Sequence, residues 1–300
     1  MVCGSSNTDM VVRAPHFPAP GETLLGGEFL MNAGGKGANQ AVAAARLGGD
    51  VIFAGKTGDD LFGHRATSLL REEGIDVSGV TVDPELPSGV ALITVNSAGE
   101  NTIVVAPGAN GTYSPEDFNR ALPELEHSDI LLMQLEIPIS TVEYIAGKAR
   151  GMKTRVILNP APAAPLSDEL LKALYLITPN ETEASLLTGI QVTDESSARE
   201  AASLLHQKGV EKVIITMGAA GAFYLSEGKS GIIAAPRVVA ADTTAAGDTF
   251  NGALAVALTE GKSLEESILF ANRAAAISVT RPGAQASIPF RNEVTVSNFR

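Results

Sequence analysis

The stretch "VILNPAPAAPLSDELLKALYLITPNETEASLLT", residues 156–188, contains two short apolar runs, and a helix-like segment follows each of them. Residues 156–158 and 175–177 are unbroken apolar runs of the kind that forms buried parallel strands. Residues 167–174 and 181–188 have the composition and length of short helices. The stretch therefore predicts two strand–helix units of an α/β sheet.

The same alternation extends in both directions along the chain. Apolar runs predict further strands at 51–54, 129–135 and 212–216, and helices are expected at 60–73, 140–150 and 196–208. Strands joined through helices form a mainly parallel central sheet that is covered by helices on both faces. In such sheets ligands bind beyond the carboxyl ends of the strands, so the polar residues there become candidates for a site.

Two segments, 9–33 and 76–106, contain strand-like runs without any helix between them. We expect them to form a small β-sheet that stands off the main body, as an insertion in a single domain comprising residues 1–300. The small sheet could be a lid over a cleft, or an edge extension or dimer interface, and these uses are compatible.

Composition limits the possible partners and the compartment. The chain has 22 basic and 34 acidic residues among 300, a net charge of −12. So acidic a surface argues against nucleic acid or an anionic membrane as partner. Cys3 is the single cysteine, which excludes an intramolecular disulfide and fits a reducing, cytoplasmic location. No apolar run reaches the roughly 18 residues of a membrane span, and the start lacks signal-peptide features.

A glycine-rich turn leads into an alanine-rich helix in "AGGKGANQAVAAARLGG", residues 33–49. Gly35 and Gly37 allow close approach of the backbone, and Lys36 and Asn39 lie near the start of the helix. Their ammonium and carboxamide groups suit the hydroxyls of a polar ligand. The alternative is a tight strand-to-helix turn with Lys36 in solvent. The turn is not a P-loop, because a glycine follows the lysine.

Further polar residues follow the expected strands. Asn7 and Asp9, in "GSSNTDM", would point to the same side of an extended chain and could hold adjacent hydroxyls, although a polar turn is the simpler interpretation. Glu136, Asn180 and Glu183 each come after an apolar run. Glu183 could hold water around a magnesium ion. For Asn180 and Glu183 the alternative is local capping of a helix.

The helix expected within "DTTAAGDTFNGALAVAL", residues 242–258, begins with unusually small residues. Ala245, Ala246 and Gly247 leave the first backbone N–H groups accessible to an anion, an interaction worth about 0.3–2 kcal/mol. Asp248 would repel a phosphate unless a substrate hydroxyl lies between them. It could then act as the base that accepts the hydroxyl proton during phosphoryl transfer. The alternative is that the acid only caps the helix.

These motifs occur in an order that resembles the ribokinase-like family of carbohydrate and nucleoside kinases. The matching segments are "GSSNTDM", "GGKGANQAVAAARLG", "LLMQLE", "NPAPA", "TPNETEA", "ITMGAAG", "DTTAAGDTFNGALAVAL" and "RPGAQASIP". The resemblance implies ATP-dependent phosphorylation of D-ribose at its 5-hydroxyl. It also implies a β lid that closes over the sugar and often pairs in a homodimer. Another sugar or nucleoside kinase, or a non-catalytic sugar-binding relative, remains an alternative.

The resemblance also implies roles for individual residues. The positions that match sugar contacts are Asn7, Asp9, Gly35, Lys36, Gly37, Asn39 and Glu136. Asp248 matches the catalytic base, and Ala245, Ala246 and Gly247 match the anion hole. The positions that match ATP contacts are Asn180, Thr216, Gly218, Gly221 and Gly247, with Glu183 associated with Mg²⁺. Asn272 would lie near the adenine, at a position where some relatives have a histidine. An activating K⁺ would be held, largely through carbonyl oxygens, by Asp242, Thr244, Ser278, Arg281, Gly283 and Ser287.

Overall fold

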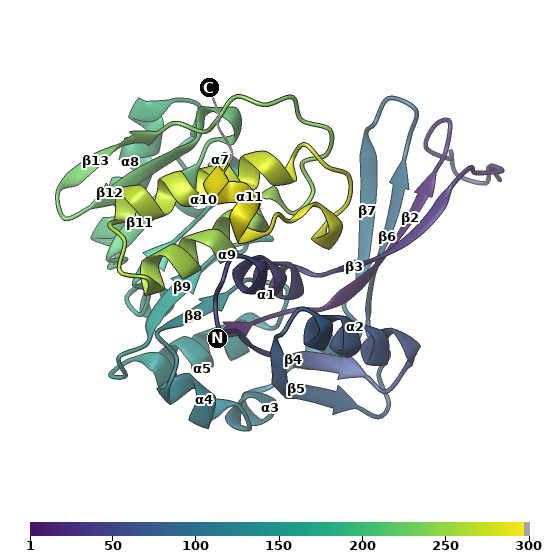
Figure 1. The fold of residues 1–300 in the computed structure, drawn as a ribbon, viewed down its shortest axis with the longest axis horizontal. Helices are drawn as coiled ribbons and strands as arrows, with labels where there is room; N and C mark the ends of the chain where they lie inside the picture. Colours follow the sequence, from purple (N-terminus) through teal and green to yellow (C-terminus); the bar gives the residue numbers. More distant parts are fainter. Residues whose placement is uncertain (297–300) are drawn as a thin grey trace.

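The computed structural model describes residues 1–296 and is built around a nine-stranded sheet (Figure 1). Its strand order is β13-β12-β11-β10-β9-β8-β1-β4-β5, with parallel pairing from β11 through β5 and antiparallel pairing of β12 and β13 at one edge. The strands are β1 (Val2–Cys3), β4 (Ile52–Gly58), β5 (Asp76–Asp83), β8 (Ile130–Met133), β9 (Arg155–Leu158), β10 (Leu176–Ile177), β11 (Lys212–Thr216), β12 (Ala222–Ser226) and β13 (Lys229–Ile233). The predicted fold class, a mainly parallel sheet between helices, is confirmed.

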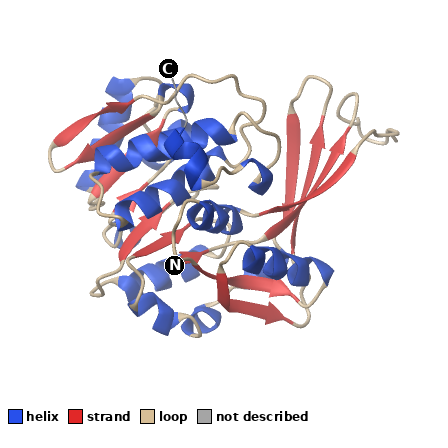
Figure 2. Cartoon of the chain, viewed as in Figure 1, coloured by secondary structure: helices blue, strands red, loops and turns tan. Residues whose placement is uncertain are grey.

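Helices cover both faces of this sheet (Figure 2), and each face has its own apolar core. In β8 the side chains of Ile130 and Leu132 enter one core and those of Leu131 and Met133 the other, the period of two that a strand imposes. The first core is built with α1 (Lys36–Arg46), α2 (Leu61–Glu72), α9 (Ala246–Thr259), α10 (Leu264–Ser278) and α11 (Arg291–Val296). The second is built with α3 (Pro115–Asn119), α4 (Leu122–Glu126), α5 (Ile139–Ala149), α6 (Asp168–Leu171), α7 (Glu181–Thr188) and α8 (Glu195–Gln207).

A separate four-stranded sheet projects beside the main body (Figure 1). It consists of β2 (Asn7–Arg13), β3 (Phe29–Gly34), β6 (Gly89–Val95) and β7 (Asn101–Ala106), in the order β3-β2-β6-β7. Strand β2 pairs antiparallel with β3 and parallel with β6.

The expected extent of the small sheet is wrong for one of its two segments. Residues 76–83 form β5, which pairs with β4 at the edge of the main sheet, so the second segment contributes only residues 89–106. In β5 the residues Val77, Gly79 and Thr81 are buried and alternate with more exposed ones. This is the pattern of a strand that has one face against the core of the main sheet. The lack of a helix between 76 and 106 did not distinguish an edge strand of the main sheet from the small sheet.

Candidate active site

Asp248 occupies the first turn of α9 and is 5% exposed. Its two carboxylate oxygens accept hydrogen bonds from side chains of α1. The Asn39 Nδ2 donates to Oδ2 at 3.0 Å, and the Gln40 Nε2 donates to Oδ1 at 3.0 Å. The start of α9 has no side-chain cap hydrogen bond, so the alternative in which the acid only caps its own helix is not observed.

Asp248 lines a narrow polar pocket of about 180 Å³. The pocket lies beyond the carboxyl ends of β9, β10 and β11, as the rule for parallel α/β sheets predicts. Its walls are formed by Lys36, Asn159, Ala161, Thr178, Asn180, Glu183, Thr216, Thr243, Ala245, Ala246, Gly247, Asp248 and Asn251. Lys36 therefore faces this pocket, which disfavours the alternative of a fully solvated lysine.

The turn before α9 leaves some of its N–H groups unpaired. Ala245, the N-cap residue, has a left-handed backbone with φ 60°, which is uncommon for a residue other than glycine. The Ala246 N–H donates to the Thr243 carbonyl at 3.2 Å, so this amide, expected to face an anion, is already engaged. Within residues 1–296, no acceptor is found for the N–H groups of Ala245, Gly247 or Asp248.

Asn7 and Asp9 lie at the start of strand β2, so the polar turn that is the simpler interpretation of this stretch is not observed. The Asp9 carboxylate lies over Gly34, where an added Cβ would collide with it. Gly35, with φ 89°, starts α1 so close to the Asn7 backbone that only glycine fits. Burial, together with the charges of Glu136 and Asp248, raises the pKa of Asp9 to about 7.

Glu136 joins this group from the segment after β8. Its Oε2 accepts hydrogen bonds from the Ser5 hydroxyl at 2.5 Å and from the Lys36 backbone N–H at 3.0 Å, so it caps the start of α1. Burial alone would lower the pKa of the Lys36 ammonium, but nearby carboxylates outweigh burial and raise it. These carboxylates belong to Asp248, Glu136 and Glu183.

Helix capping, the alternative interpretation of Asn180 and Glu183, is observed in the structure. The Asn180 side chain accepts from the Glu183 N–H at 2.8 Å, and Glu183 Oε2 accepts from the Asn180 N–H at 2.9 Å, forming a capping box at the start of α7. Both residues also line the narrow pocket. Burial raises the pKa of Glu183.

A wider pocket of about 830 Å³ adjoins the narrow one and shares Asn180, Thr216, Thr243, Ala246 and Gly247 with it. Gly218 and Gly221 lie at its edge, in the loop after β11. Asn272, on α10, also lines it and donates its Nδ2 to the Ile233 carbonyl at 2.8 Å. The remaining walls are largely apolar and include Pro236, Val238, Phe250, Ala275, Ala276 and Val279. Of the residues that the sequence assigned to the sugar, Lys36 and Asp248 line the narrow pocket, whereas Asn7, Asp9, Asn39 and Glu136 line neither pocket.

The residues proposed for a potassium site lie in two segments, the loop before α9 and the end of α10 with the loop and short 3-10 helix that follow it. The Asp242 carboxylate links the loops by accepting from the N–H of Thr244 at 2.9 Å and that of Gly283 at 2.8 Å. Despite partial burial, these hydrogen bonds and the charge of Arg13 lower the pKa of Asp242. The Arg281 guanidinium pairs with Glu293. The hydroxyls of Ser278 and Ser287 donate to the carbonyls of Ala275 and Ala284.

The fit of a monovalent cation to these loops rests on carbonyl oxygens. In the described part of the chain, no donor is found for the carbonyl oxygens of Asp242, Thr244, Arg281 or Gly283. These oxygens are chemically suited to a hard cation, whereas the two serine hydroxyls are engaged within the protein.

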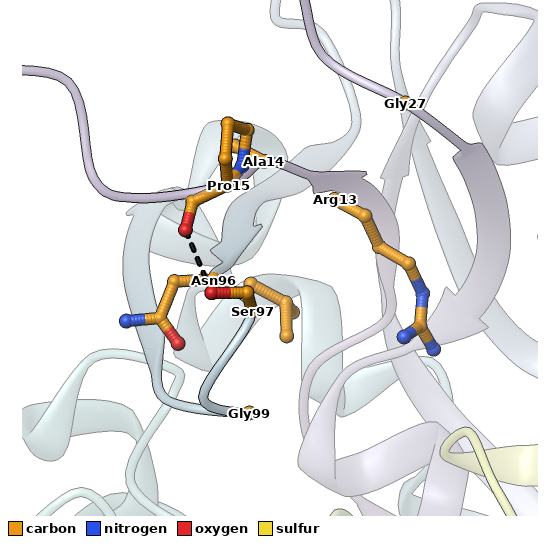
Figure 3. Close-up of a pocket in the computed structure, with 8 residues that line it drawn as sticks. Arg13, Ala14, Pro15, Gly27, Asn96, Ser97 and Gly99 are labelled. Carbon is orange, nitrogen blue, oxygen red and sulfur yellow. Dashed lines mark hydrogen bonds between the residues drawn. The ribbon is translucent and has the colours of Figure 1, made fainter.

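A hollow of about 350 Å³ lies at the tip of the small sheet, and Figure 3 labels most of the residues that line it. There the Ser97 hydroxyl donates to the Pro15 carbonyl at 2.9 Å. None of the predicted site residues lines this hollow.

Sequence reasoning missed Gln40, Asn159, Thr178 and Asn251, which are buried beside Asp248 or line the narrow pocket. Asn159 follows β9 as Asn180 follows β10, so the rule that selected Asn180 could have found it. Gln40 and Asn251 lie inside helices among alanines and other small residues. An amide side chain within such a run does not by itself indicate a site, because its hydrogen-bond partner comes from an element far away in the chain.

Within residues 1–296, no group of three or more His, Cys, Asp or Glu side chains is placed to hold a metal ion. None of the helices in this part of the chain has both the length and the apolarity to cross a bilayer.

Known proteins are similar to this chain in sequence and architecture. Residues 1–291 match the pfkB family carbohydrate kinases. Ribokinase of Haemophilus influenzae is 51% identical over 292 residues, covering 97% of this chain and 95% of the relative. Deoxyribokinase of Salmonella typhi is 39% identical, covering 96% and 94%. The structure of Arabidopsis thaliana ribokinase complexed with ribose and ATP superposes with a TM-score of 0.91 at 34% identity, covering 98% and 96%. This chain therefore belongs to the pfkB family of carbohydrate kinases.

Proposed function

We propose that this protein transfers the terminal phosphoryl group of ATP to the 5-hydroxyl of D-ribose, giving ribose 5-phosphate and ADP. The observation that carries the proposal is the position of Asp248 and the unpaired N–H groups of the α9 start, where the narrow polar pocket meets the wider one. A proton acceptor and an anion-binding turn are the two parts that phosphoryl transfer to a hydroxyl needs.

The residues divide between the two substrates. Asn7, Asp9, Lys36 and Asn39 would bind the sugar hydroxyls, together with the free oxygen of Glu136 and the backbone of Gly35 and Gly37. The Asn39 Oδ1 is buried and has no hydrogen-bond partner among the described residues. The wider pocket, with its apolar walls and the Gly218–Gly221 loop, would bind ATP next to Asn180, Thr216 and Asn272.

Within this arrangement Asp248 accepts the proton of the reacting hydroxyl. The N–H groups of Ala245, Gly247 and Asp248 stabilise the negative charge of the phosphoryl group as it passes between the pockets. The Lys36 ammonium lines the same pocket and adds a positive charge. Ala246 contributes by its small size, since its N–H is bonded to Thr243.

Two cations fit the residues present. Glu183 is a buried carboxylate that lines the narrow pocket, which suits a Mg²⁺ that keeps most of its waters and is held mainly by phosphates. When bound, Mg²⁺ would neutralise phosphate charge. The carbonyl oxygens of Asp242, Thr244, Arg281 and Gly283 suit K⁺, which would set the shape of the turn that precedes α9.

The small sheet would act as a lid and as the interface of a homodimer. Met31, Met10, Leu92 and Val104 lie directly opposite one another across its four strands, and therefore share one face. Leu92 and Val104 are 54% and 68% exposed. A second copy of the chain would bury this apolar row. The buried single cysteine and the acidic surface favour a site of action in the cytoplasm.

Release of ADP in the presence of individual sugars tests the substrate. We expect turnover with ribose that exceeds turnover with fructose or adenosine. The Salmonella deoxyribokinase similarity makes 2-deoxyribose the most informative competitor, since preference for it would replace ribose in the proposal. Binding of ribose without any turnover would instead indicate a non-catalytic sugar-binding protein.

The variant Asp248→Asn tests the mechanism. It should fold and bind ribose, because asparagine has nearly the same shape, while kcat falls by about 10²–10⁴-fold through loss of the base. Near-normal turnover in this variant would refute the assigned role.

A further inference from the structure

Gln40 links the proposed base to a buried amide network. The side chain is fully buried, and its Nε2 donates both to Asp248 Oδ1 at 3.0 Å and to Asn159 Oδ1 at 3.0 Å. Its Oε1 accepts from the Gln134 Nε2 at 2.6 Å. An ionised carboxylate only accepts hydrogen bonds, so the nitrogen end of Gln40 must face Asp248 and the oxygen end must face Gln134.

The network continues to the peptide that follows Gly247. The Asn159 Nδ2 donates to the Thr178 carbonyl at 3.1 Å, and the Thr178 hydroxyl donates to Asn251 Oδ1 at 2.6 Å. The Asn251 Nδ2 then donates to the Gly247 carbonyl at 2.8 Å. Although Asn251 lines the narrow pocket, both ends of its amide are engaged within the protein.

The hydrogen bond to the Gly247 carbonyl also orients the N–H group of Asp248. The Gly247 carbonyl and the Asp248 N–H belong to one planar peptide unit, so holding the oxygen also sets the direction of the N–H. That N–H is one of the unpaired donors at the start of α9. The network therefore ends at the Asp248 carboxylate on one side and at an Asp248 backbone donor on the other.

We propose that Gln40 and Asn251 are positioning residues for phosphoryl transfer. Gln40 holds the carboxylate in the rotamer that accepts the hydroxyl proton, and Asn251 holds the peptide N–H toward the phosphoryl group. Asn159 and Thr178 join the two, so that base and anion-binding donor keep a fixed relative orientation. The inference rests on the function proposed above for Asp248, and neither amide needs to touch a substrate.

The first test is Gln40→Met, which keeps the length of the side chain but removes both donor hydrogens. We expect kcat to fall about tenfold to a hundredfold, the effect of losing one hydrogen bond to a charged group. The KM values for ribose and ATP should change less than about threefold, because the orientation matters for transfer rather than for binding. An unchanged kcat, or a loss that lies entirely in KM, would overturn the proposal.

A double-mutant cycle separates positioning from a general structural defect. If Gln40 acts through the carboxylate, Gln40→Met should cause little further loss when it is added to Asp248→Asn. A structural defect would lower activity by the same factor in both backgrounds, and that result would overturn the assignment. High activity of Asp248→Asn alone would instead refute the role of Asp248 as the base. Failure of the base assignment can therefore be distinguished from failure of the positioning role of Gln40.

The other end of the network predicts a different pattern. Asn251→Leu, which keeps the branching at Cγ, removes the donor to the Gly247 carbonyl and should lower kcat about tenfold with little change of KM. Because Asn251 acts on the peptide and not on the base, this loss should persist in the Asp248→Asn background. Full activity of Asn251→Leu would remove this half of the proposal.

Thr154→Val is the matched control for loss of a buried hydrogen bond away from the site. The Thr154 hydroxyl donates to the Leu125 carbonyl at 2.9 Å in the second core. This variant should lose stability in urea while kcat stays unchanged. If it lowers kcat as much as Gln40→Met does, the effect at position 40 is not specific.

Gln40→Glu provides a second readout if Gln40→Met fails to fold, because glutamate and glutamine have the same shape. A protonated carboxyl group at this position can donate to Asp248, whereas an ionised one repels it. We expect the ratio of the activity of Gln40→Glu to that of the parent to rise as the pH falls. The charged groups around Asp248, which are Lys36, Asp9 and Glu183, are the same residues in both proteins. A pH-independent ratio would contradict the positioning role.

Discussion

Gly252 of α9 lies directly against Ala43 of α1. A Cβ added at Gly252 would stand 2.6 Å from the Ala43 Cβ and 2.8 Å from the Ala44 backbone nitrogen. Gly252 follows Asp248 by one helical turn, and Ala43 follows Asn39 and Gln40 by one turn. The close approach of the two helices therefore brings the amides of α1 within hydrogen-bond distance of the Asp248 carboxylate.

This contact predicts that Gly252→Ala is harmful although alanine favours helices. The added methyl group would force the helices apart, and overpacking of this kind costs about 1–3 kcal/mol. Urea unfolding should show the loss of stability, and kcat should fall because Asn39 and Gln40 move away from Asp248. Gly147→Ala, in the exposed part of α5 where nothing lies within 4 Å, is the control and should stabilise the protein by about 1 kcal/mol. Equal behaviour of both variants would contradict the contact.

The raised pKa of Asp9 predicts a pH dependence of sugar binding. With a pKa of about 7, the carboxylate is ionised above neutrality and becomes protonated as the pH falls through 7. The ionised form can accept two sugar hydroxyls, so kcat/KM for ribose should decline below pH 7. Asp9→Asn should lower kcat/KM and flatten this decline. A profile in Asp9→Asn that keeps the same acid limb would assign the limb to another group.

The same shift has a consequence for stability. A carboxyl group whose pKa is higher in the folded than in the unfolded protein stabilises the fold below its unfolded pKa of about 4. That contribution is lost as the pH rises through 7. The free energy of unfolding of Asp9→Asn, measured by urea titration, should therefore increase relative to that of the parent as the pH rises from 4 to 8. A constant difference over this range would contradict the shift.

The link made by Asp242 predicts a defect that depends on the cation. Asp242→Ala frees the N–H groups of Thr244 and Gly283, so the two loops lose their common acceptor. We expect the parent to be more active in K⁺ than in Li⁺. The variant should need more K⁺ for half-maximal activity. Titration of K⁺ at constant ionic strength, with ADP release as readout, measures both. If the parent is indifferent to the cation, the loops do not form a cation site, although the kinase assignment stands.

Cys3 offers a probe of unfolding. It is fully buried in β1, and burial raises the pKa of its thiol to about 12. A thiol reagent should therefore react at a rate set by opening of the sheet. Labelling should be slow in the native protein, fast in urea, and slower still with ribose and ADP bound. Rapid native labelling at the rate of a free thiol would show that β1 is accessible.

The apolar row on the small sheet predicts self-association. Leu92→Glu should convert a dimer to a monomer in analytical ultracentrifugation, because a charge would be buried against the second copy. Leu186→Glu, on α7, also replaces an exposed leucine and should leave the oligomeric state unchanged. A parent protein that is monomeric at micromolar concentration would refute the interface.

Several features of the site could be predicted from sequence because local rules fix them. The apolar runs placed the strands, and the rule for parallel sheets selected Asn180 and Glu183 at their ends. The run of small residues before Asp248 marked the start of a buried helix with accessible N–H groups. In each case the prediction depends only on residues that are close together in the chain, because strands and helices repeat with short, known periods.

Tertiary contacts decided the rest. The sequence of β5 fits either sheet, and only its pairing with β4 assigned it to the main one. The left-handed backbone of Ala245 and the bond that engages the Ala246 N–H depend on how the turn packs. The partners of Asp248 come from a helix more than 200 residues earlier in the chain. Sequence by itself determined which segments are strands, helices and polar turns, because those follow from local sterics and burial periodicity. The tertiary structure alone decided which polar groups meet, because pairing across the chain depends on the close approach of packed helices.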